Sequence, residues 1–275
     1  MSTPRLSTHN TPIRLGRVVL YAFVALVLVF LALPSLIVIP VSFNPTSIIE
    51  FPPRGFTTRW YQRYLELPGW IDATWTSFVI ATGTVLLSLV LGTLGAYALA
   101  RSRASGRRLL RSLILLPLIV PSLITAIAIY GLFSDLNLRG TIVGFIIAHA
   151  VLAIPFVTVI MTASFLGLDP RIEDAARGLG ANRVRAIWRV TIPLVLPGLV
   201  SSALLSFLVS FDELMIALFL SDPFVSTLPK KLWDGIQMEI DPTLAAVSTI
   251  FTVVSLVILI AVGWVRFKLE REPTS

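Results

Sequence analysis

Six apolar runs, each long enough to cross a lipid bilayer, constrain this chain more than any other feature. They occupy residues 18–41, 76–100, 112–133, 141–166, 198–220 and 244–265. A helix needs about 20 apolar residues to cross the hydrocarbon core, where its backbone must satisfy its own hydrogen bonds. The sequence therefore predicts an all-α integral membrane protein with six transmembrane helices and no soluble domain of any size.

The composition agrees with this class and removes several alternatives. Charged residues make up 13% of the 275 residues and hydrophobic residues 56%, too few charges to solvate a soluble protein of this size. The chain has no cysteine and two histidines, so it cannot supply a thiolate nucleophile, a disulfide or a histidine-rich metal site. It also lacks a G-x-x-x-x-G-K-[ST] phosphate loop. We therefore expect no catalytic residue and no cofactor in this chain, and any ATP and Mg²⁺ must be bound by a partner.

The distribution of basic residues predicts the orientation. Residues 1–17, 101–111, 171–189 and 266–271 hold 16 of the 22 basic residues. Cytoplasmic connections of membrane proteins carry an excess of Lys and Arg, so these four segments are expected in the cytoplasm, with both termini. The net charge of +7 then reflects topology and not nucleic-acid binding. The outer segments hold Arg54, Arg59, Arg63, Arg139, Lys230 and Lys231.

The first two apolar runs and the connection between them carry further structural signals. The run 18–41 is too long for a cleaved signal peptide and is expected to be the first transmembrane helix, preceded by the cytoplasmic N-terminus 1–17. The aromatic-rich connection after it predicts an interfacial helix at 57–67 without a ligand role. Within the second run, small residues are expected to let helices approach closely. These are Gly83, Gly92 and Gly95.

Later in the chain, Pro117 and Pro121 are expected to break the third run. His149 lies inside the fourth run, and we expect a packed, hydrogen-bonded core residue there rather than a ligand.

A basic stretch at 169–197 separates the fourth and fifth runs. Asp169 suits an N-cap and Pro170 a first helical position, while Gly178 and Gly180 suit left-handed positions after the helix. This predicts a short helix over 170–179. A further helical turn is expected at 183–189, before Pro193 and Pro197 interrupt the helix.

This stretch resembles the EAA loop of the inner-membrane permease subunits of bacterial ABC importers. The family pattern is E-A-A, three residues, G, nine residues, then I-x-L-P, and its spacing is intact here. The resemblance implies a type I ABC importer permease (MetI-like) fold over residues 72–265, with 266–275 as a cytoplasmic tail. It also implies that the loop docks on a separate ATPase subunit. The residues expected to couple to that ATPase are Glu173, Asp174, Ala175, Ala176, Gly180 and Pro193.

Two adjacent carboxylates, Asp212 and Glu213, lie inside the fifth run. A carboxylate in mid-membrane costs about 2.5–3.5 kcal/mol, and neighbouring helical residues cannot both face one side. One is therefore expected to face a water-filled pathway or a cation, while the other pairs with a helix or caps a break. The outer connection predicts a helix over 232–240 after the helix-stopping Pro229. Its Trp233 and Asp234 suit an amine cation or a docking partner.

The region 173–249 resembles the spermidine/putrescine branch of the permease family, through S-F-D-E-L-x-I-A-L-F-L-S-D-P, L-P-K-K-L-W and E-I-D-P-T-L-A-A-V-S-T. This implies import of a polyamine or related small organic solute by two permease subunits, two ATP-binding subunits and an extracytoplasmic solute-binding protein, in the bacterial inner membrane. Ser122 departs from the branch, which carries an acidic residue there, so ferric iron, opine-like and phosphonate-like solutes remain open. A secondary transporter driven by an ion gradient is the alternative from another class.

Overall fold

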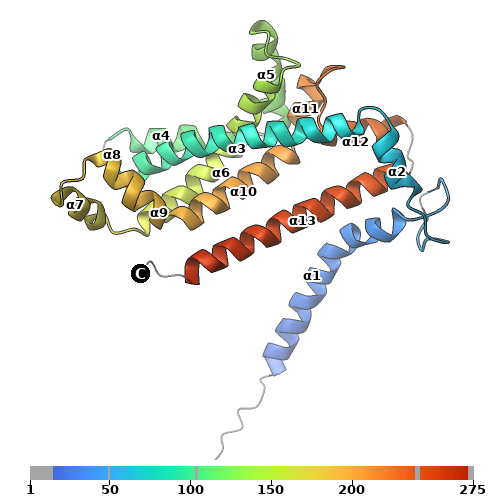
Figure 1. Cartoon of the computed structure of the whole chain (residues 1–275), viewed down its shortest axis with the longest axis horizontal. Coiled ribbons are helices and arrows are strands. Elements are labelled where there is room, and N and C mark those ends of the chain that lie inside the picture. The colour runs from blue at the N-terminus through green and yellow to red at the C-terminus, as the bar shows by residue number, and fades with distance from the viewer. Residues whose placement is uncertain (1–14, 49, 103–104, 239–241, 272–275) are drawn as a thin grey trace, which may run out of the picture.

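The computed structural model describes residues 15–48, 50–102, 105–238 and 242–271, and every regular element in these ranges is a helix (Figure 1). Most of the predicted N-terminus 1–17, the last four residues of the predicted tail and residues 239–241 lie outside the described residues. In chain order the helices are α1 (Leu15–Val41), α2 (Arg59–Glu66), α3 (Trp70–Arg101), α4 (Arg107–Leu115), η1 (Leu116–Leu118), α5 (Ser122–Asp135), α6 (Ile142–Leu166), α7 (Arg171–Gly178), α8 (Arg183–Ala186), η2 (Ile187–Thr191), α9 (Ile192–Leu194), α10 (Leu196–Phe211), α11 (Met215–Leu220), α12 (Leu228–Met238) and α13 (Pro242–Arg271).

Helices α3, α6 and α10 form the centre of the bundle and run along its long axis (Figure 1). A Cβ atom added to Gly92 would lie 2.7 Å from Cβ of Val157, so a side chain at Gly92 would force α3 and α6 apart. At the same crossing the Thr158 hydroxyl donates to the Gly92 carbonyl at 3.3 Å. Gly83 likewise packs against Ile146. The predicted use of small residues for close helix approach is confirmed.

Buried hydroxyl groups join the three central helices inside their apolar core. Ser88 of α3 contacts Ser206 of α10 at 2.6 Å between hydroxyl oxygens. One turn further, the Ser210 hydroxyl donates to Thr84 at 3.2 Å and lies 2.8 Å from Nδ1 of His149. His149 is 1% exposed, which confirms the prediction of a hydrogen-bonded core histidine. Polar pairs of this kind fix the register of apolar helices, whose packing alone is less directional.

Aromatic residues attach α13 and α2 to this core at the opposite end from α7. Phe211 stacks on Phe251 with ring centroids 5.0 Å apart, which holds α13 against α10. Trp60 of α2 is 1% exposed, and its indole N–H donates to the Asn44 carbonyl at 2.7 Å. The helix predicted at 57–67 is therefore confirmed as α2, and Trp60 and Tyr64 are buried against the protein. Its location at the membrane interface stays a prediction.

Two of the apolar runs, 112–133 and 198–220, are broken. The helices α4 and η1 meet α5 at 99°, which confirms the predicted break near Pro117 and Pro121. Pro121 cannot donate a backbone hydrogen bond, so the chain turns there and α5 leaves the bundle beside α11 (Figure 1). The run 198–220 is also not one helix, because α10 ends at Phe211 and α11 begins at Met215.

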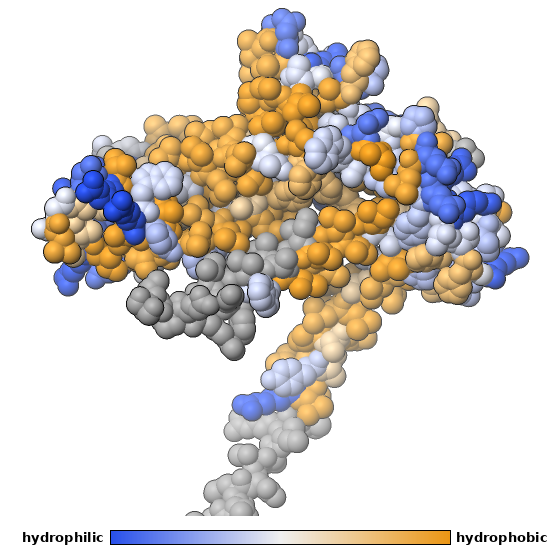
Figure 2. Space-filling model, viewed as in Figure 1, coloured by the Kyte–Doolittle hydropathy of each residue, from blue (hydrophilic) through white to orange (hydrophobic). Residues whose placement is uncertain are grey.

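The structure supports only part of the predicted number of membrane spans. Within the described residues, α1, α3 and α6 are long and apolar enough to cross a membrane. Two bent pairs of helical segments, 107–118 with α5 and 183–194 with α10, raise the number to five if each pair is one span. Helix α13 contributes a shorter apolar stretch, Pro242–Val257. An apolar belt separates two more hydrophilic ends of the molecule (Figure 2). The all-α membrane fold is therefore clear, and six spans stays a prediction.

Helix α12 begins earlier than the sequence indicated. The expected helix at 232–240, with Pro229 as a stop, was wrong in its start, because α12 runs from Leu228. Pro229 is the second residue of α12, where a missing N–H breaks no intrahelical bond, so proline opens this helix instead of ending the preceding one. The Leu228 amide donates to the Ser77 hydroxyl at 2.7 Å, which ties the start of α12 to α3.

Candidate functional site

The segment 169–191 folds into a short helix, a tight turn and a second helical turn at one end of the bundle (Figure 1). Helix α7 begins at Arg171 with Pro170 at its N-cap position, one residue later than predicted, and Oδ1 of Asp169 accepts from the Arg171 amide at 2.9 Å. Oδ1 of Asn182 accepts from the Arg185 amide at 2.8 Å and begins α8, a cap that sequence reasoning missed. Helical structure then continues through Pro193 to Leu194 and bends by 74° before α10 begins at Leu196, so the expected interruption lies between Pro193 and Pro197. The π-helical turn η2 immediately before α9 accommodates Pro193.

One glycine makes the turn after α7. The Ala181 amide donates to the Ala176 carbonyl at 3.1 Å and the Gly180 amide to the Arg177 carbonyl at 3.0 Å, the two bonds of a Schellman C-cap. Gly180 has φ +92°, a conformation that disfavours any side chain. Gly178 lies inside α7 with right-handed backbone, so its expected left-handed conformation was wrong.

The two adjacent carboxylates of α7 have different surroundings. Oε2 of Glu173 accepts from the Tyr97 hydroxyl at 2.9 Å, and Oε1 lies 3.3 Å from Nη2 of Arg101. The side chains of Glu173 and Arg101 are each 13% exposed, and Arg101 also donates to the Leu168 carbonyl. Asp174 is 72% exposed and pairs only loosely with Arg177, at 3.6 Å. Glu173 therefore attaches α7 to α3, whereas Asp174 faces outward.

The outer surface of this segment is partly apolar. Ala175, Gly180 and Pro193 are exposed and Ala176 is partly buried. Leu179, between the two glycines, is 91% exposed, which is exceptional for a leucine that faces water. Sequence reasoning missed Leu179, although an apolar residue at the C-cap of an otherwise polar helix is a visible signal.

A cavity of about 310 Å³ separates α7 and α8 from the end of α3. Besides Glu173, its lining includes Arg177 and Arg183. The contact of Glu173 with Tyr97 and Arg101 crosses one side of this cavity, so α7 is held at a distance from the core.

Replacement of Glu173 by Gln is expected to loosen α7. The substitution removes the charge from two hydrogen bonds that are poorly exposed to water, where charge-assisted bonds contribute about 1.5–3 kcal/mol each. Hydrogen exchange of the α7 amides in the purified protein should accelerate by tenfold or more. The matched control is Asp174→Asn, the neighbouring exposed carboxylate, which should leave exchange within about twofold. Equal exchange in the two variants would contradict the assignment.

The break between α10 and α11 contains the two carboxylates of the fifth run. Oε1 of Glu213 accepts from the Ile216 amide at 3.0 Å, so Glu213 caps the start of α11. Asp212 follows the last residue of α10, and its side chain is exposed. The expectation that one carboxylate caps a break agrees with Glu213. Asp212 is the more exposed of the two, and a role for it in a pathway stays a prediction.

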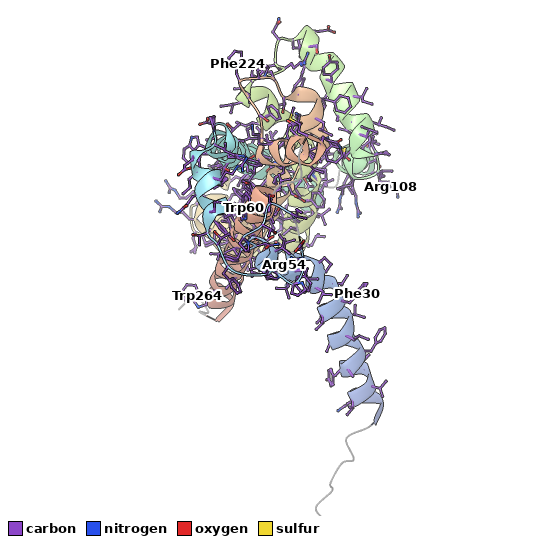
Figure 3. The ribbon with its side chains drawn as sticks, turned by 90° about the vertical axis from the view of Figure 1, so that its right-hand side faces the viewer. Phe30, Arg54, Trp60, Arg108, Phe224 and Trp264 are labelled. Carbon is purple, nitrogen blue, oxygen red and sulfur yellow. The ribbon has the colours of Figure 1, made fainter. Side chains whose placement is uncertain are left out.

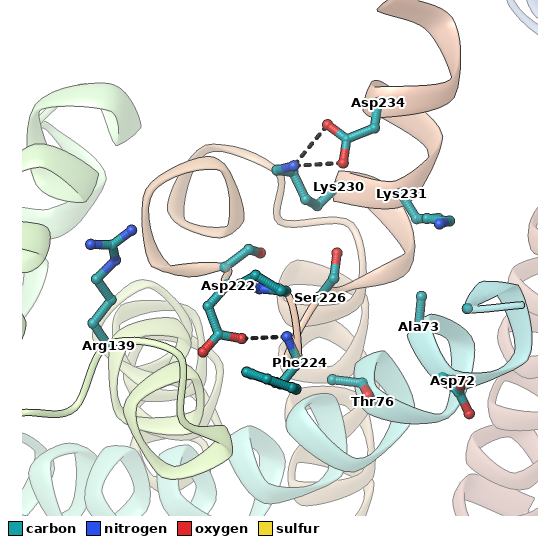
Figure 4. Close-up of a pocket in the computed structure, with 13 residues that line it drawn as sticks. Asp72, Ala73, Thr76, Arg139, Asp222, Phe224, Ser226, Lys230, Lys231 and Asp234 are labelled. Atoms are coloured by element: carbon teal, nitrogen blue, oxygen red, sulfur yellow. Dashed lines mark hydrogen bonds and ion pairs between the residues drawn. The ribbon is translucent and has the colours of Figure 1, made fainter. Parts of the chain in front are cut away.

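The other two predicted pathway residues, Trp233 and Asp234, belong to α12, at the opposite end of the bundle from α7. A cavity of about 540 Å³ there is lined by charged residues of both signs from α3, α12 and the connections beside them (Figure 4). Asp234 lines it and pairs with Lys230 through both carboxylate oxygens, at 2.6 and 2.7 Å. Trp233 is 39% exposed and, like Asp212 and Glu213, is not part of this lining. The structure therefore does not gather the four predicted pathway residues around one cavity.

Comparisons with known proteins connect this geometry to a family. A family model described as "Binding-protein-dependent transport system inner membrane component" matches residues 88–271. The spermidine/putrescine transport system permease protein PotC of Escherichia coli (strain K12) is 28% identical over 247 residues, 90% of this chain and 93% of that protein. The putrescine transport system permease protein PotI of the same strain is 32% identical over 246 residues, 86% of this chain and 84% of that protein.

A solved structure shares the fold. It is a bacterial ABC transporter involved in the import of the acidic polysaccharide alginate, and one of its chains matches with a TM-score of 0.68 at 21% identity. The match covers 97% of this chain and 99% of that chain.

Proposed function

The chain belongs to the family of binding-protein-dependent transport system inner membrane components, and on this premise we propose that it forms half of the translocation pathway of an ATP-driven importer. A second permease subunit forms the other half, two ATP-binding subunits hydrolyse ATP, and an extracytoplasmic binding protein delivers the solute. Membership of this family decides against the secondary transporter driven by an ion gradient.

The coupling role belongs to the segment 169–191. Its exposed residues include Asp174, Ala175, Leu179 and Gly180, which offer one carboxylate, small side chains and an apolar anchor. Five exposed arginines surround them: Arg171, Arg177, Arg183, Arg185 and Arg189. Such a surface suits insertion into a groove of the ATPase. Glu173 transmits the movement by its attachment to α3.

The second permease subunit is supported by apolar surface that this chain does not cover. Helix α1 points away from the bundle (Figure 3), and all its described side chains from Arg17 to Leu36 are exposed. Ile124, Ile127 and Leu132 on α5 are each more than half exposed. We assign these surfaces to lipid and to the second subunit, which is expected to be a different chain.

The proposed substrate is a polyamine or a related small organic cation. The similarity to PotC and PotI supports it, as does the exposed Asp212 at a helix break, where a cation gains a charged partner inside the membrane. Ser122, at the start of α5, supplies no carboxylate, so recognition depends on Asp212 and on the second subunit.

Uptake into sealed right-side-out membrane vesicles tests the proposal. The complex is first purified through a tag on this chain, and the binding protein that accompanies it is added to the vesicles with labelled spermidine or putrescine. Uptake should require ATP trapped inside, because the coupling segment is proposed to face the cytoplasm. If the vesicles take up labelled ferric iron, opine or phosphonate and not a polyamine, the proposed substrate is wrong. Uptake driven by a proton gradient without ATP would reject the importer.

A further inference from the structure

A second cavity, of about 240 Å³, opens between α3, α4 and α6 near the end of the bundle that carries α7. One side is apolar, formed by Leu99, Leu115 and Leu166 among others. The other side carries Arg107 and Arg111, one helical turn apart on α4. A cavity with an apolar wall and two cations at its rim suits an amphiphilic anion.

Among the polar side chains of this cavity, Thr158 donates to the Gly92 carbonyl, whereas Arg107, Arg111 and Thr162 have no partner within the described residues. Among the described residues, no carboxylate lies within ion-pair distance of Arg107 or Arg111, in contrast to Arg101 and Arg177. Thr162 also lines the cavity, and its buried hydroxyl oxygen has no hydrogen-bond partner in the part of the chain that the structure describes. Buried polar atoms are rarely left unsatisfied, and two neighbouring cations repel each other unless an anion compensates them.

The surface around the cavity indicates which kind of anion it binds. Leu109 and Leu113 of α4 are 65% and 58% exposed, so this helix presents apolar side chains to its surroundings beside its arginines. Arginines at the start of an otherwise apolar helix lie at the boundary between lipid tails and headgroups. In the proposed orientation this boundary belongs to the cytoplasmic leaflet, where negative headgroups gather and basic pockets between helices bind them.

We propose that this cavity binds an anionic phospholipid. Arg107 and Arg111 bind its phosphodiester, the Thr162 hydroxyl donates to one of its oxygens, and the apolar wall covers the first methylenes of an acyl chain. The lipid joins α4 to α6 beside the segment that couples to the ATPase, and ATP-driven movement then depends on the lipid composition. The inference rests on the proposed orientation of the importer and is independent of its substrate.

The test compares two neighbouring arginines. The complex purified through this chain is placed in nanodiscs that contain phosphatidylglycerol and phosphatidylcholine, and the lipid retained after release into detergent is measured by native mass spectrometry. Arg111→Gln should reduce retained phosphatidylglycerol by fivefold or more. Arg108→Gln should change it by less than twofold, because Arg108 is an exposed neighbour that does not line the cavity (Figure 3).

Two further measurements keep the inference falsifiable. Inorganic phosphate at millimolar concentration should not displace the retained lipid, since it lacks the acyl chain; displacement would assign the cavity to a free anion. If Arg108→Gln and Arg111→Gln lose equal amounts of retained phosphatidylglycerol, the lipid is held by general attraction to a basic surface. The proposed binding site is then wrong. Because lipid retention is measured without solute, a failure of polyamine uptake leaves this result interpretable.

Discussion

Gly180→Ala should lower ATP-driven uptake by about tenfold while leaving the amount of membrane-inserted protein unchanged. Gly180 has φ +92°, and a residue with a Cβ atom pays about 1–2 kcal/mol in this region. No heavy atom beyond its chain neighbours lies within 4 Å of the added Cβ, so the effect comes from backbone conformation and not from a clash. The left-handed turn that is proposed to dock on the ATPase is destabilised by the same free energy. Each 1.4 kcal/mol lowers its population about tenfold.

Gly178→Ala is the matched control for this prediction. Gly178 lies two residues earlier, has equally open space where a Cβ atom would lie, and has a right-handed backbone in α7, where Ala is the better helix former. Uptake by this variant should stay within twofold of the unchanged protein. ATPase co-purification and solute uptake are measured for both variants. If the two variants show equal uptake and equal ATPase co-purification, the left-handed turn at Gly180 has no role in coupling.

Asp212→Asn should reduce the uptake of a polyamine by about 10- to 100-fold. Asp212 is the exposed carboxylate at the break after α10, and a charged hydrogen-bonded contact to a cation contributes about 1.5–3 kcal/mol. Asn keeps the shape and removes the charge. The loss should appear in transport at low solute concentration, whereas ATPase co-purification should not change.

Glu213→Gln distinguishes the pathway from the break itself. Glu213 caps α11 through the Ile216 amide, and a glutamine side-chain oxygen can still accept that bond. This variant should therefore transport polyamine within about threefold of the unchanged protein. If Glu213→Gln abolishes uptake and Asp212→Asn does not, the roles of the two carboxylates are reversed.

The sequence was sufficient for features that depend on neighbours along the chain. Long apolar runs predicted the helices, prolines predicted the break before α5, and the spacing around Gly180 predicted the turn after α7. In each case the controlling interaction lies within a few residues, or concerns the lipid as a solvent, so no knowledge of distant contacts was needed.

The features that could not be predicted depend on contacts between distant residues. Glu173 meets Tyr97 and Arg101, which are 76 and 72 positions away, and only the folded chain shows that this carboxylate faces inward while Asp174 faces outward. The 99° bend before α5 likewise depends on packing against α11, because proline permits a bend without fixing its angle. The role of Pro229 is equally ambiguous in sequence, because its local pattern is the same whether it ends one helix or opens the next.

The cavity beneath α7 makes the attachment of this helix directional. A load that draws α7 away from the bundle stretches the bonds of Glu173 to Tyr97 and Arg101 at once, so tension reaches α3 without delay. A load that presses α7 inward narrows the cavity of about 310 Å³ and stretches neither bond. Under the proposed coupling, a pull by the ATPase is therefore expected to reach α3 more directly than a push.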